Sequence, residues 1–190
     1  PTADVSARCL TLFALLDDPR YELTRARVRS YLLAEQENDG SWFGRWGTNY
    51  VYGTWSALVA LGFDGLERNR EAVQRGVAWL EARQNSDGGW GEGNQTYHDP
   101  ELAGTGRRSR AFQTGWAMLG LVSAGHADSQ ALRRGAEYLV RTQSARGDWP
   151  EPWFTAPGFP RVFYLKYHGY SRYFPLWALA AARRAWRPTA

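Results

Sequence analysis

Three charged segments of the chain carry hydrophobic residues at every third or fourth position. Val73, Val77 and Leu80 show this spacing in one of the segments. It places the apolar side chains on one face of an α-helix and leaves the opposite face polar. The pattern therefore predicts three amphipathic, half-buried helices, over residues 23–35, 69–83 and 129–142.

Between these segments lie stretches that are almost free of charge and rich in small residues. They cover 54–61, 112–124 and 175–182, and 5–16 is a less pure example. A helix that is apolar on all sides is buried on all sides. The chain is thus expected to alternate buried and half-exposed helices, seven or so in all. No strand pattern of comparable strength is present.

A seven-residue motif, Q-x3-G-x-W, occurs three times, and similar residues precede each copy. Arg75–Leu80 matches Arg134–Leu139 at the same distance upstream. Glycine tolerates the positive φ that ends many helices, so the helix is expected to stop at the glutamine. The tryptophan after the turn can then wedge between neighbouring repeats. The copies lie at 36–42, 84–90 and 143–149.

Alternating inner and outer helices predict an all-α fold, a curved double layer of helical hairpins. About seven helices give an open arc, a partial α–α barrel. An open arc leaves apolar helix faces exposed at both ends. We therefore expect either that the chain is part of a longer one or that another surface covers these ends, for example in a homodimer.

Composition narrows the classes of function. The chain has 23 basic and 19 acidic residues, a mild excess whose only tight cluster is Arg107, Arg108 and Arg110. Nucleic-acid binding usually needs a denser basic stripe, so it is not expected, whereas an anionic membrane surface is compatible with this charge. The single cysteine, Cys9, excludes a disulfide framework and a multi-thiolate zinc site. No metal or other cofactor is expected.

Longer stretches resemble one family. The segments 40–54, 87–92 and 158–170, together with the repeated motif, are similar to the C-terminal part of squalene–hopene cyclases, which are triterpene cyclases. The resemblance covers residues 1–190. It implies part of the catalytic α–α barrel of a bacterial monotopic enzyme on the cytoplasmic side of the membrane. Such enzymes protonate squalene in a dry cavity and form hopanoid-type pentacyclic triterpenes.

The acid that starts this cyclisation is absent from the chain. The family uses a D-x-D-D motif, and no such motif occurs here. Asp17 and Asp18, the one adjacent acidic pair, precede Pro19 where a helix is expected to end, and a turn is the better interpretation. The resemblance thus places the acid upstream, in the rest of the same polypeptide. We expect the isolated 190-residue chain to be inactive.

Three residues are expected to support that acid. By the resemblance, Asp4 and Arg8 match a segment that neighbours it, and Tyr97 matches a tyrosine thought to help return its proton. Arg8 departs from the histidine of hopene formers. An arginine favours the ionised form of a nearby acid, which leaves the exact substrate open. The alternatives are an exposed helical position for Arg8 and an ordinary loop position for Tyr97.

A carbocation needs stabilisers that are electron-rich but do not trap it, and aromatic faces meet both conditions. Residues 153–177 hold ten aromatic residues. Phe163, Tyr167 and Tyr170 recur at four and three positions and are expected to share one face of a helical turn. The resemblance assigns the substrate cavity wall to Phe159, Phe163, Leu165, Tyr167, Tyr170 and Trp90. For Trp90 a purely structural role in the repeat is an equal alternative.

Two other functions compete with a squalene cyclase. A cyclase acting on another prenyl or cyclic terpene would keep the same aromatic wall. A non-catalytic repeat module would bind its partner on a concave face, and it predicts polar inner helices, which 54–61 and 112–124 are not. A zinc-dependent prenyltransferase subunit is disfavoured because only one cysteine is present. The expected ligand is squalene or a similar polyprenyl hydrocarbon.

Overall fold

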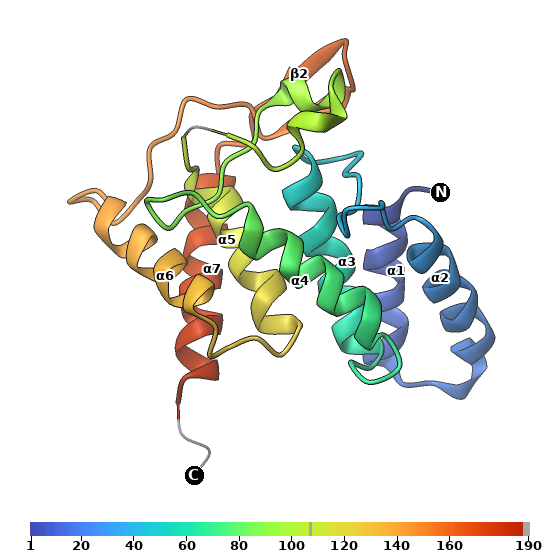
Figure 1. Ribbon diagram of the computed structural model, residues 1–190. Coiled ribbons are helices and arrows are strands. Elements are labelled where there is room, and N and C mark those ends of the chain that lie inside the picture. The colour runs from blue at the N-terminus through green and yellow to red at the C-terminus, as the bar shows by residue number, and fades with distance from the viewer. Residues whose placement is uncertain (107, 188–190) are drawn as a thin grey trace.

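The computed structural model describes residues 1–106 and 108–187 (Figure 1). Within them the chain forms seven α-helices, three short 3₁₀-helices and one β-hairpin. The α-helices are α1 Ala3–Leu16, α2 Glu22–Ala34, α3 Tyr50–Asp64, α4 Arg70–Ala82, α5 Ala111–Ser123, α6 Gln130–Thr142 and α7 Tyr170–Ala185. The 3₁₀-helices are η1 Pro19–Tyr21, η2 Asn94–Tyr97 and η3 Pro100–Leu102, and the strands are β1 Ala156–Phe159 and β2 Phe163–Leu165.

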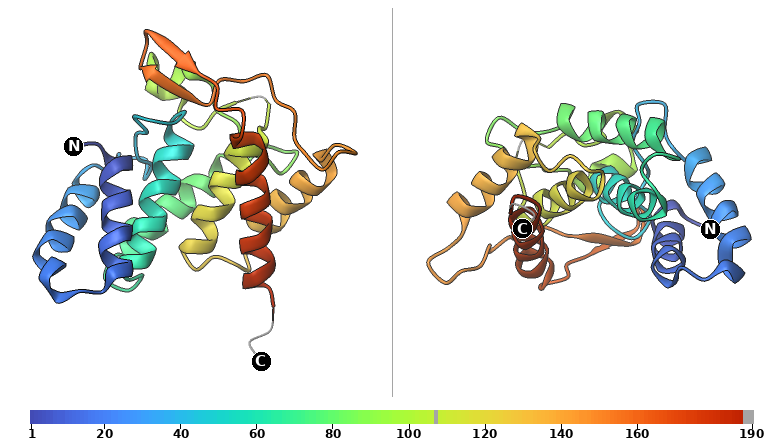
Figure 2. Two further views of the ribbon diagram at one scale, coloured as in Figure 1. Left: turned by 180° about the vertical axis from the view of Figure 1, so that it is seen from behind. Right: turned by 90° about the horizontal axis from the view of Figure 1, so that it is seen from below.

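The α-helices form two curved layers, which confirms the predicted fold class. Helices α1, α3, α5 and α7 pack side by side in chain order as the inner layer. Helices α2, α4 and α6 lie outside them, each packed against its neighbours in the chain. The right-hand view in Figure 2, seen from below, shows the inner helices following an arc whose ends are α1 and α7.

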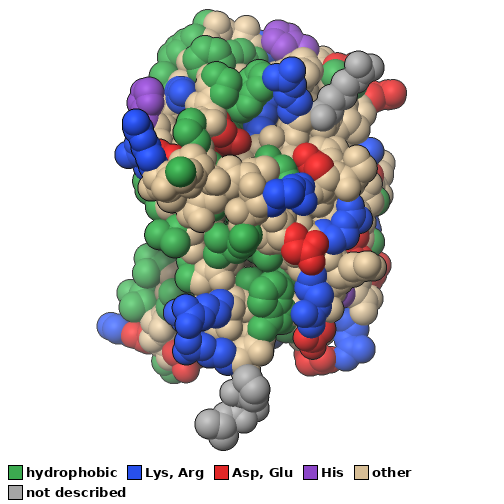
Figure 3. Space-filling model, turned by 90° about the vertical axis from the view of Figure 1, so that its left-hand side faces the viewer, with side chains coloured by type: hydrophobic (Ala, Val, Ile, Leu, Met, Phe, Trp, Pro, Cys, Tyr) green, Lys and Arg blue, Asp and Glu red, His purple; other side chains and the backbone are tan. Residues whose placement is uncertain are grey.

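Burial follows the expected contrast between the middle and the ends of the arc. Most residues of α3 and α5 are buried, because neighbours cover these helices on both sides. At the ends, Leu15 of α1 is 63% exposed and Leu176 of α7 is 62% exposed. Figure 3 views the α6 and α7 end, where hydrophobic side chains lie between charged ones. The arc is open at both ends.

The first two Q-x3-G-x-W motifs link consecutive outer helices through one set of contacts, whereas Gln143 of the third bonds, among the described residues, only within its own turn. The Gln84 side-chain amide donates to the Gly88 carbonyl at 2.8 Å and to the Ala131 carbonyl of the next outer helix, also at 2.8 Å. Gly88 has a φ of 91°, and a Cβ there would lie 2.6 Å from the Arg134 carbonyl oxygen. Each motif therefore ends one outer helix, and the first two also dock the next outer helix against the turn.

The segment before α7 corrects the prediction of an aromatic helical stripe. Phe163 lies in strand β2, Tyr167 in the loop that follows, and only Tyr170 is helical. Strands β1 and β2 pair antiparallel, with Ala156 opposite Leu165. Backbone pairing within a Gly- and Pro-rich segment outweighs the helical spacing of its aromatic residues. The absence of a strong strand pattern in the sequence thus did not exclude a short hairpin.

Candidate functional site

A cluster of aromatic side chains fills the space between α3, α5 and α7. The rings of Trp55 and Trp116 stack with centroids 5.8 Å apart and planes only 5° from parallel. Phe174 stands edge-on to both rings, at 5.4 and 5.5 Å. We call this group the aromatic cluster. Its members are Tyr52, Trp55, Phe112, Trp116, Tyr170, Phe174 and Trp177.

The aromatic cluster offers electron-rich faces in a largely water-free setting. Trp55 and Trp116 are almost completely buried, and their indole N–H groups have no hydrogen-bond partner in the described part of the chain. Trp177, at the open end of the arc, is 54% exposed. Desolvated rings of this kind stabilise a nearby cation by about 2 kcal/mol or more.

The predicted wall residues divide into two groups. Tyr167 stacks on Tyr170 at 4.9 Å, and Tyr170 in turn contacts Phe174, so both tyrosines adjoin the aromatic cluster. Phe159 and Phe163 contact each other on the hairpin, with centroids 5.7 Å apart. Both phenylalanines and the nearby Leu165 are exposed. Their assignment to a substrate cavity stays a prediction, because the described chain leaves that side open.

Arg8 lies against the aromatic cluster. Its guanidinium carbon is 4.3 Å from the Trp55 ring centroid and 5.9 Å from that of Tyr52. An Nη atom donates to the Ser56 hydroxyl at 3.2 Å. Arg8 thus lies over an inner helix while its side chain stays exposed, as the alternative of an exposed helical position expects, and a role beside the acid remains a prediction.

Asp4 is buried at the start of α1 and ties that helix to the loop before α3. One carboxylate oxygen accepts the backbone N–H of Trp46 at 2.7 Å. The other accepts the Thr2 hydroxyl and the N–H of Val5. These contacts position the 45–48 loop beside α1. They do not test whether Asp4 supports a catalytic acid.

Tyr97 is buried below the same loop. Its hydroxyl lies 2.8 Å from the carbonyl oxygens of both Gly44 and Gly47, to either of which it can donate. Burial raises the pKa of Tyr97, and the nearby charges of Glu92 and Asp4 raise it further. In this arrangement Tyr97 fixes the loop. A role in returning a proton to an acid remains a prediction.

Trp90 makes the contacts of a repeat tryptophan. It is fully buried, and its indole N–H donates to the Leu80 carbonyl at 2.8 Å. Trp42 and Trp149 donate to carbonyls ten residues upstream in the same way. The structural interpretation of Trp90 accounts for all of these contacts, and its place in a substrate cavity is untested.

Two buried carboxylates near the site were not singled out from the sequence. Glu92 accepts backbone N–H groups of Asn49, Tyr50 and Val51, at the start of α3. Glu151 accepts the N–H of Ala111 at 2.6 Å, at the start of α5. Negative charge at a helix N-terminus is favourable, but burial is the larger effect and raises the pKa of both groups. The pattern W-x-E at 90–92 and 149–151 could have revealed them.

The sequence also did not identify the members of the aromatic cluster that α3 and α5 contribute. Trp55 and Trp116 lie within the helical patterns 54–61 and 112–124, and their spacing does not show that they meet. A tryptophan one or two residues after a threonine, in Thr54-Trp55 and Thr114-Gly115-Trp116, was the available clue. Both threonine hydroxyls accept the backbone N–H of a repeat tryptophan.

No helix within the described residues is long and apolar enough to cross a membrane.

Curated relatives match nearly all of the chain. It is 51% identical over 187 residues to squalene–hopene cyclase of Zymomonas mobilis, covering 96% of this chain and 28% of that protein. For squalene–hopene cyclase of Alicyclobacillus acidocaldarius the identity is 45%, with 97% and 29% covered. Dammaradiene synthase of Dryopteris crassirhizoma is 42% identical, with 96% and 30% covered. The chain thus spans less than a third of each relative.

Solved structures support the fold. An ent-copalyl diphosphate synthase from Streptomyces platensis superposes with a TM-score of 0.64 at 22% identity, covering 97% of this chain and 32% of that one. A protein from Actinoplanes gives 0.68 at 18% identity, with 97% and 55% covered. The model of the squalene–hopene cyclase C-terminal domain matches residues 1–184. By this match and these identities, the chain belongs to the squalene–hopene cyclase C-terminal domain family.

Proposed function

We propose that the chain forms part of the catalytic barrel of an enzyme that cyclises squalene to hopanoid-type pentacyclic triterpenes. The observation that carries this proposal is the aromatic cluster, which packs electron-rich rings between α3, α5 and α7 and reaches the open end of the arc at Trp177. A migrating carbocation can be stabilised by such faces without being trapped. The named relatives at 45–51% identity, all squalene–hopene cyclases, support the choice of substrate and product.

The rest of the polypeptide completes the site in this proposal. It supplies the D-x-D-D acid and the opposite wall, and it covers the exposed ends of the arc at α1 and α7. The hairpin residues Phe159, Phe163 and Leu165 then face the substrate. The whole enzyme is proposed to sit on the cytoplasmic face of a bacterial membrane as a monotopic protein, with homodimer formation through apolar surface.

Incubating the complete polypeptide with squalene and analysing the products by gas chromatography and mass spectrometry tests the proposal. We expect hopene or hopanol from the complete protein and no product from the 190-residue chain alone. Product from the isolated chain would contradict the proposal that the rest of the polypeptide supplies the acid. A complete protein that cyclises another substrate but leaves squalene unchanged would contradict the proposal that squalene is the substrate.

The wall residues can be tested in the same assay. We expect Phe163→Ala to lower kcat about tenfold or more, since a cation–π contact of about 1.4 kcal/mol corresponds to a factor of ten. Phe163→Tyr keeps an aromatic face and is expected to retain activity. Val140→Ala, on the exposed side of outer helix α6, is the control. Equal losses in all three variants would exclude a specific role for the ring.

A second candidate is a cyclase for another prenyl or cyclic terpene, and Arg8 is the observation that favours it. The guanidinium occupies the Trp55 face at 4.3 Å and places a fixed positive charge there. Positive charge developing in a substrate at that point would be repelled. Competition assays with squalene and other prenyl substrates show which substrate the enzyme prefers. Running them with the wild type and with Arg8→His decides between the two candidates.

A further inference from the structure

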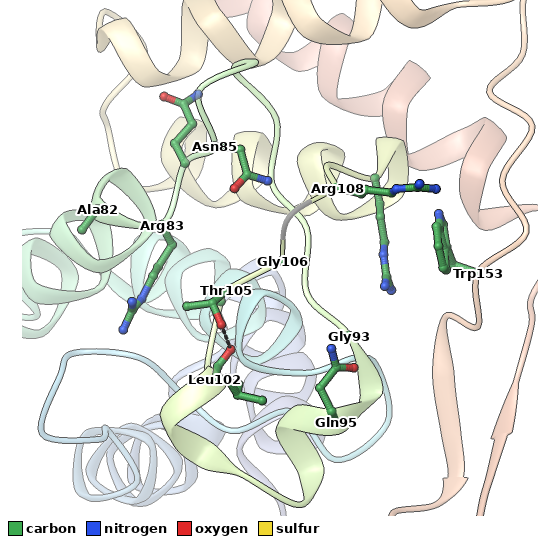
Figure 4. Close-up of a pocket in the computed structure, with 13 residues that line it drawn as sticks. Ala82, Arg83, Asn85, Gly93, Gln95, Leu102, Thr105, Gly106, Arg108 and Trp153 are labelled. Atoms are coloured by element: carbon green, nitrogen blue, oxygen red, sulfur yellow. Dashed lines mark hydrogen bonds between the residues drawn. The ribbon is translucent and has the colours of Figure 1, made fainter.

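A cavity of about 730 Å³ lies apart from the aromatic cluster. Its walls come from the end of α4, the 93–106 segment around η2 and η3, the residues just before α5, and Trp153. Figure 4 shows these elements surrounding an open space. Its volume falls within the range typical of small-molecule sites.

Three arginines line this cavity. Arg83 follows the last residue of α4, and Arg108 and Arg110 immediately precede α5. In Figure 4, Arg83 and Arg108 lie on opposite sides of the space. The guanidinium carbon of Arg110 is 4.8 Å from the ring centroid of Trp153. The amides of Gln95 and Asn85 add further polar groups to the wall.

None of the three guanidiniums has a polar partner in the described part of the protein, although Arg83 lies over the Trp79 ring at 5.8 Å and Arg110 over that of Trp153. None of them forms an ion pair or a side-chain hydrogen bond with a described residue, and the Nε atoms of Arg83 and Arg110 are buried without an acceptor. Other arginines in the fold are satisfied, as when Arg134 donates to the Asn85 carbonyl at 2.9 Å. A buried charged donor without an acceptor is unfavourable, so the Nε atoms of Arg83 and Arg110 lack a counterpart, whereas the Arg108 side chain is exposed to solvent.

The nearest carboxylates form no ion pair with these arginines, although the charge of Arg83 is close enough to Asp39 to help lower the pKa of that carboxyl. Glu151 and Glu92 influence Arg110 electrostatically, yet their hydrogen bonds go to the backbone at the starts of α5 and α3. No aspartate or glutamate is among the residues that line the cavity. Burial lowers the pKa of Arg110, as expected for a cation with too little compensating charge. The cavity is therefore positive and short of acceptors.

We propose that this cavity binds a phosphate or diphosphate group, held by Arg83, Arg108 and Arg110. Guanidinium groups present planar pairs of N–H donors that match phosphate oxygens. Three such groups favour an anion with more than one negative charge. Trp153 and Leu102 provide apolar wall for the organic part of the ligand. The group can belong to a soluble phosphate ester or to a phospholipid headgroup.

Titration calorimetry of the complete polypeptide with inorganic pyrophosphate tests the site. We expect saturable binding tighter than about 1 mM, weakened about tenfold by either Arg83→Gln or Arg108→Gln. Arg146→Gln removes the same charge from an exposed turn and is the control. Thermal unfolding of each variant verifies that it is folded.

A second arm identifies the source of the phosphate. Vesicles of phosphatidylcholine with and without phosphatidic acid are sedimented with the same variants. Selective loss of phosphatidic acid binding in Arg108→Gln supports a lipid headgroup, whereas pyrophosphate binding with unchanged sedimentation supports a soluble ester. The proposal is overturned if neither probe binds in a way that depends on Arg83 and Arg108, or if Arg146→Gln weakens binding equally.

Discussion

The buried carboxyl of Glu151 makes the stability of this protein depend on pH. One of its oxygens accepts the Ala111 N–H at 2.6 Å, and the other is buried without a partner. Burial raises the pKa of Glu151 from 4.5 to about 7. Hydrogen bonds from the start of α5 and the charge of Arg110 oppose this increase but do not cancel it.

The size of the effect follows from the two pKa values of Glu151. The difference between 7 and 4.5 is about 2.5 pH units, and each unit corresponds to 1.36 kcal/mol, which gives about 3 kcal/mol. Between these two values the folded state binds more protons than the unfolded state. The contribution to stability is therefore complete below pH 4.5 and is lost as the pH rises through about 7.

Glu151→Gln isolates this contribution, because glutamine keeps an acceptor for the Ala111 N–H but carries no charge. We expect the free energy of unfolding of the wild type to fall, relative to the variant, by up to about 3 kcal/mol as the pH is raised from about 5 to about 8. Denaturant titrations at constant ionic strength measure this difference. Glu137→Gln, on the exposed side of α6, controls for the loss of one carboxylate. A difference that does not change with pH, or that changes in the opposite direction, would refute the reasoning.

Two further predictions use the three repeats as controls for one another. Gln84→Ala removes two hydrogen bonds, one within its turn and one to the next outer helix, and is expected to cost about 2 kcal/mol in urea unfolding. Gln143→Ala removes only one and is expected to cost about 1 kcal/mol, so equal losses would argue against the link between repeats. Gly88→Ala combines a φ of 91° with a Cβ only 2.6 Å from the Arg134 carbonyl oxygen. Gly147 has a φ of 79° but no such close contact. The unfolding midpoint is therefore expected to fall less in Gly147→Ala than in Gly88→Ala. Equal decreases in the two variants would show that the close contact is unimportant.

Much of the helical framework was predictable because its determinants are local. The periodicity over 69–83 predicted a helix that the structure places at Arg70–Ala82. The acidic pair before Pro19 was interpreted as a turn, and Asp17 ends α1 with a φ of 47°. Amphipathic spacing, turn residues and helix ends each depend on a few neighbouring residues, so a single sequence contains the information.

The candidate site was less predictable because it joins residues that are far apart in the chain. Tyr167 and Tyr170 were predicted as wall residues, and the structure brings them to the aromatic cluster. Trp55 and Trp116 lie 61 positions apart, and nothing in their local patterns indicates that the rings stack. Which aromatic faces meet is decided by how α3 and α5 pack.

The sequence by itself determined the alternation of inner and outer helices, the three repeats and the family resemblance, since these depend on periodicity and on short motifs. Only the tertiary structure decided that the segment at 156–165 is a hairpin, that Glu151 accepts a hydrogen bond at the start of α5, and that Arg83 and Arg108 line opposite sides of one cavity. The energies that decide these cases are those of backbone pairing, desolvation and the electrostatics of grouped charges. Each of them depends on atoms that come close only when the layers have packed.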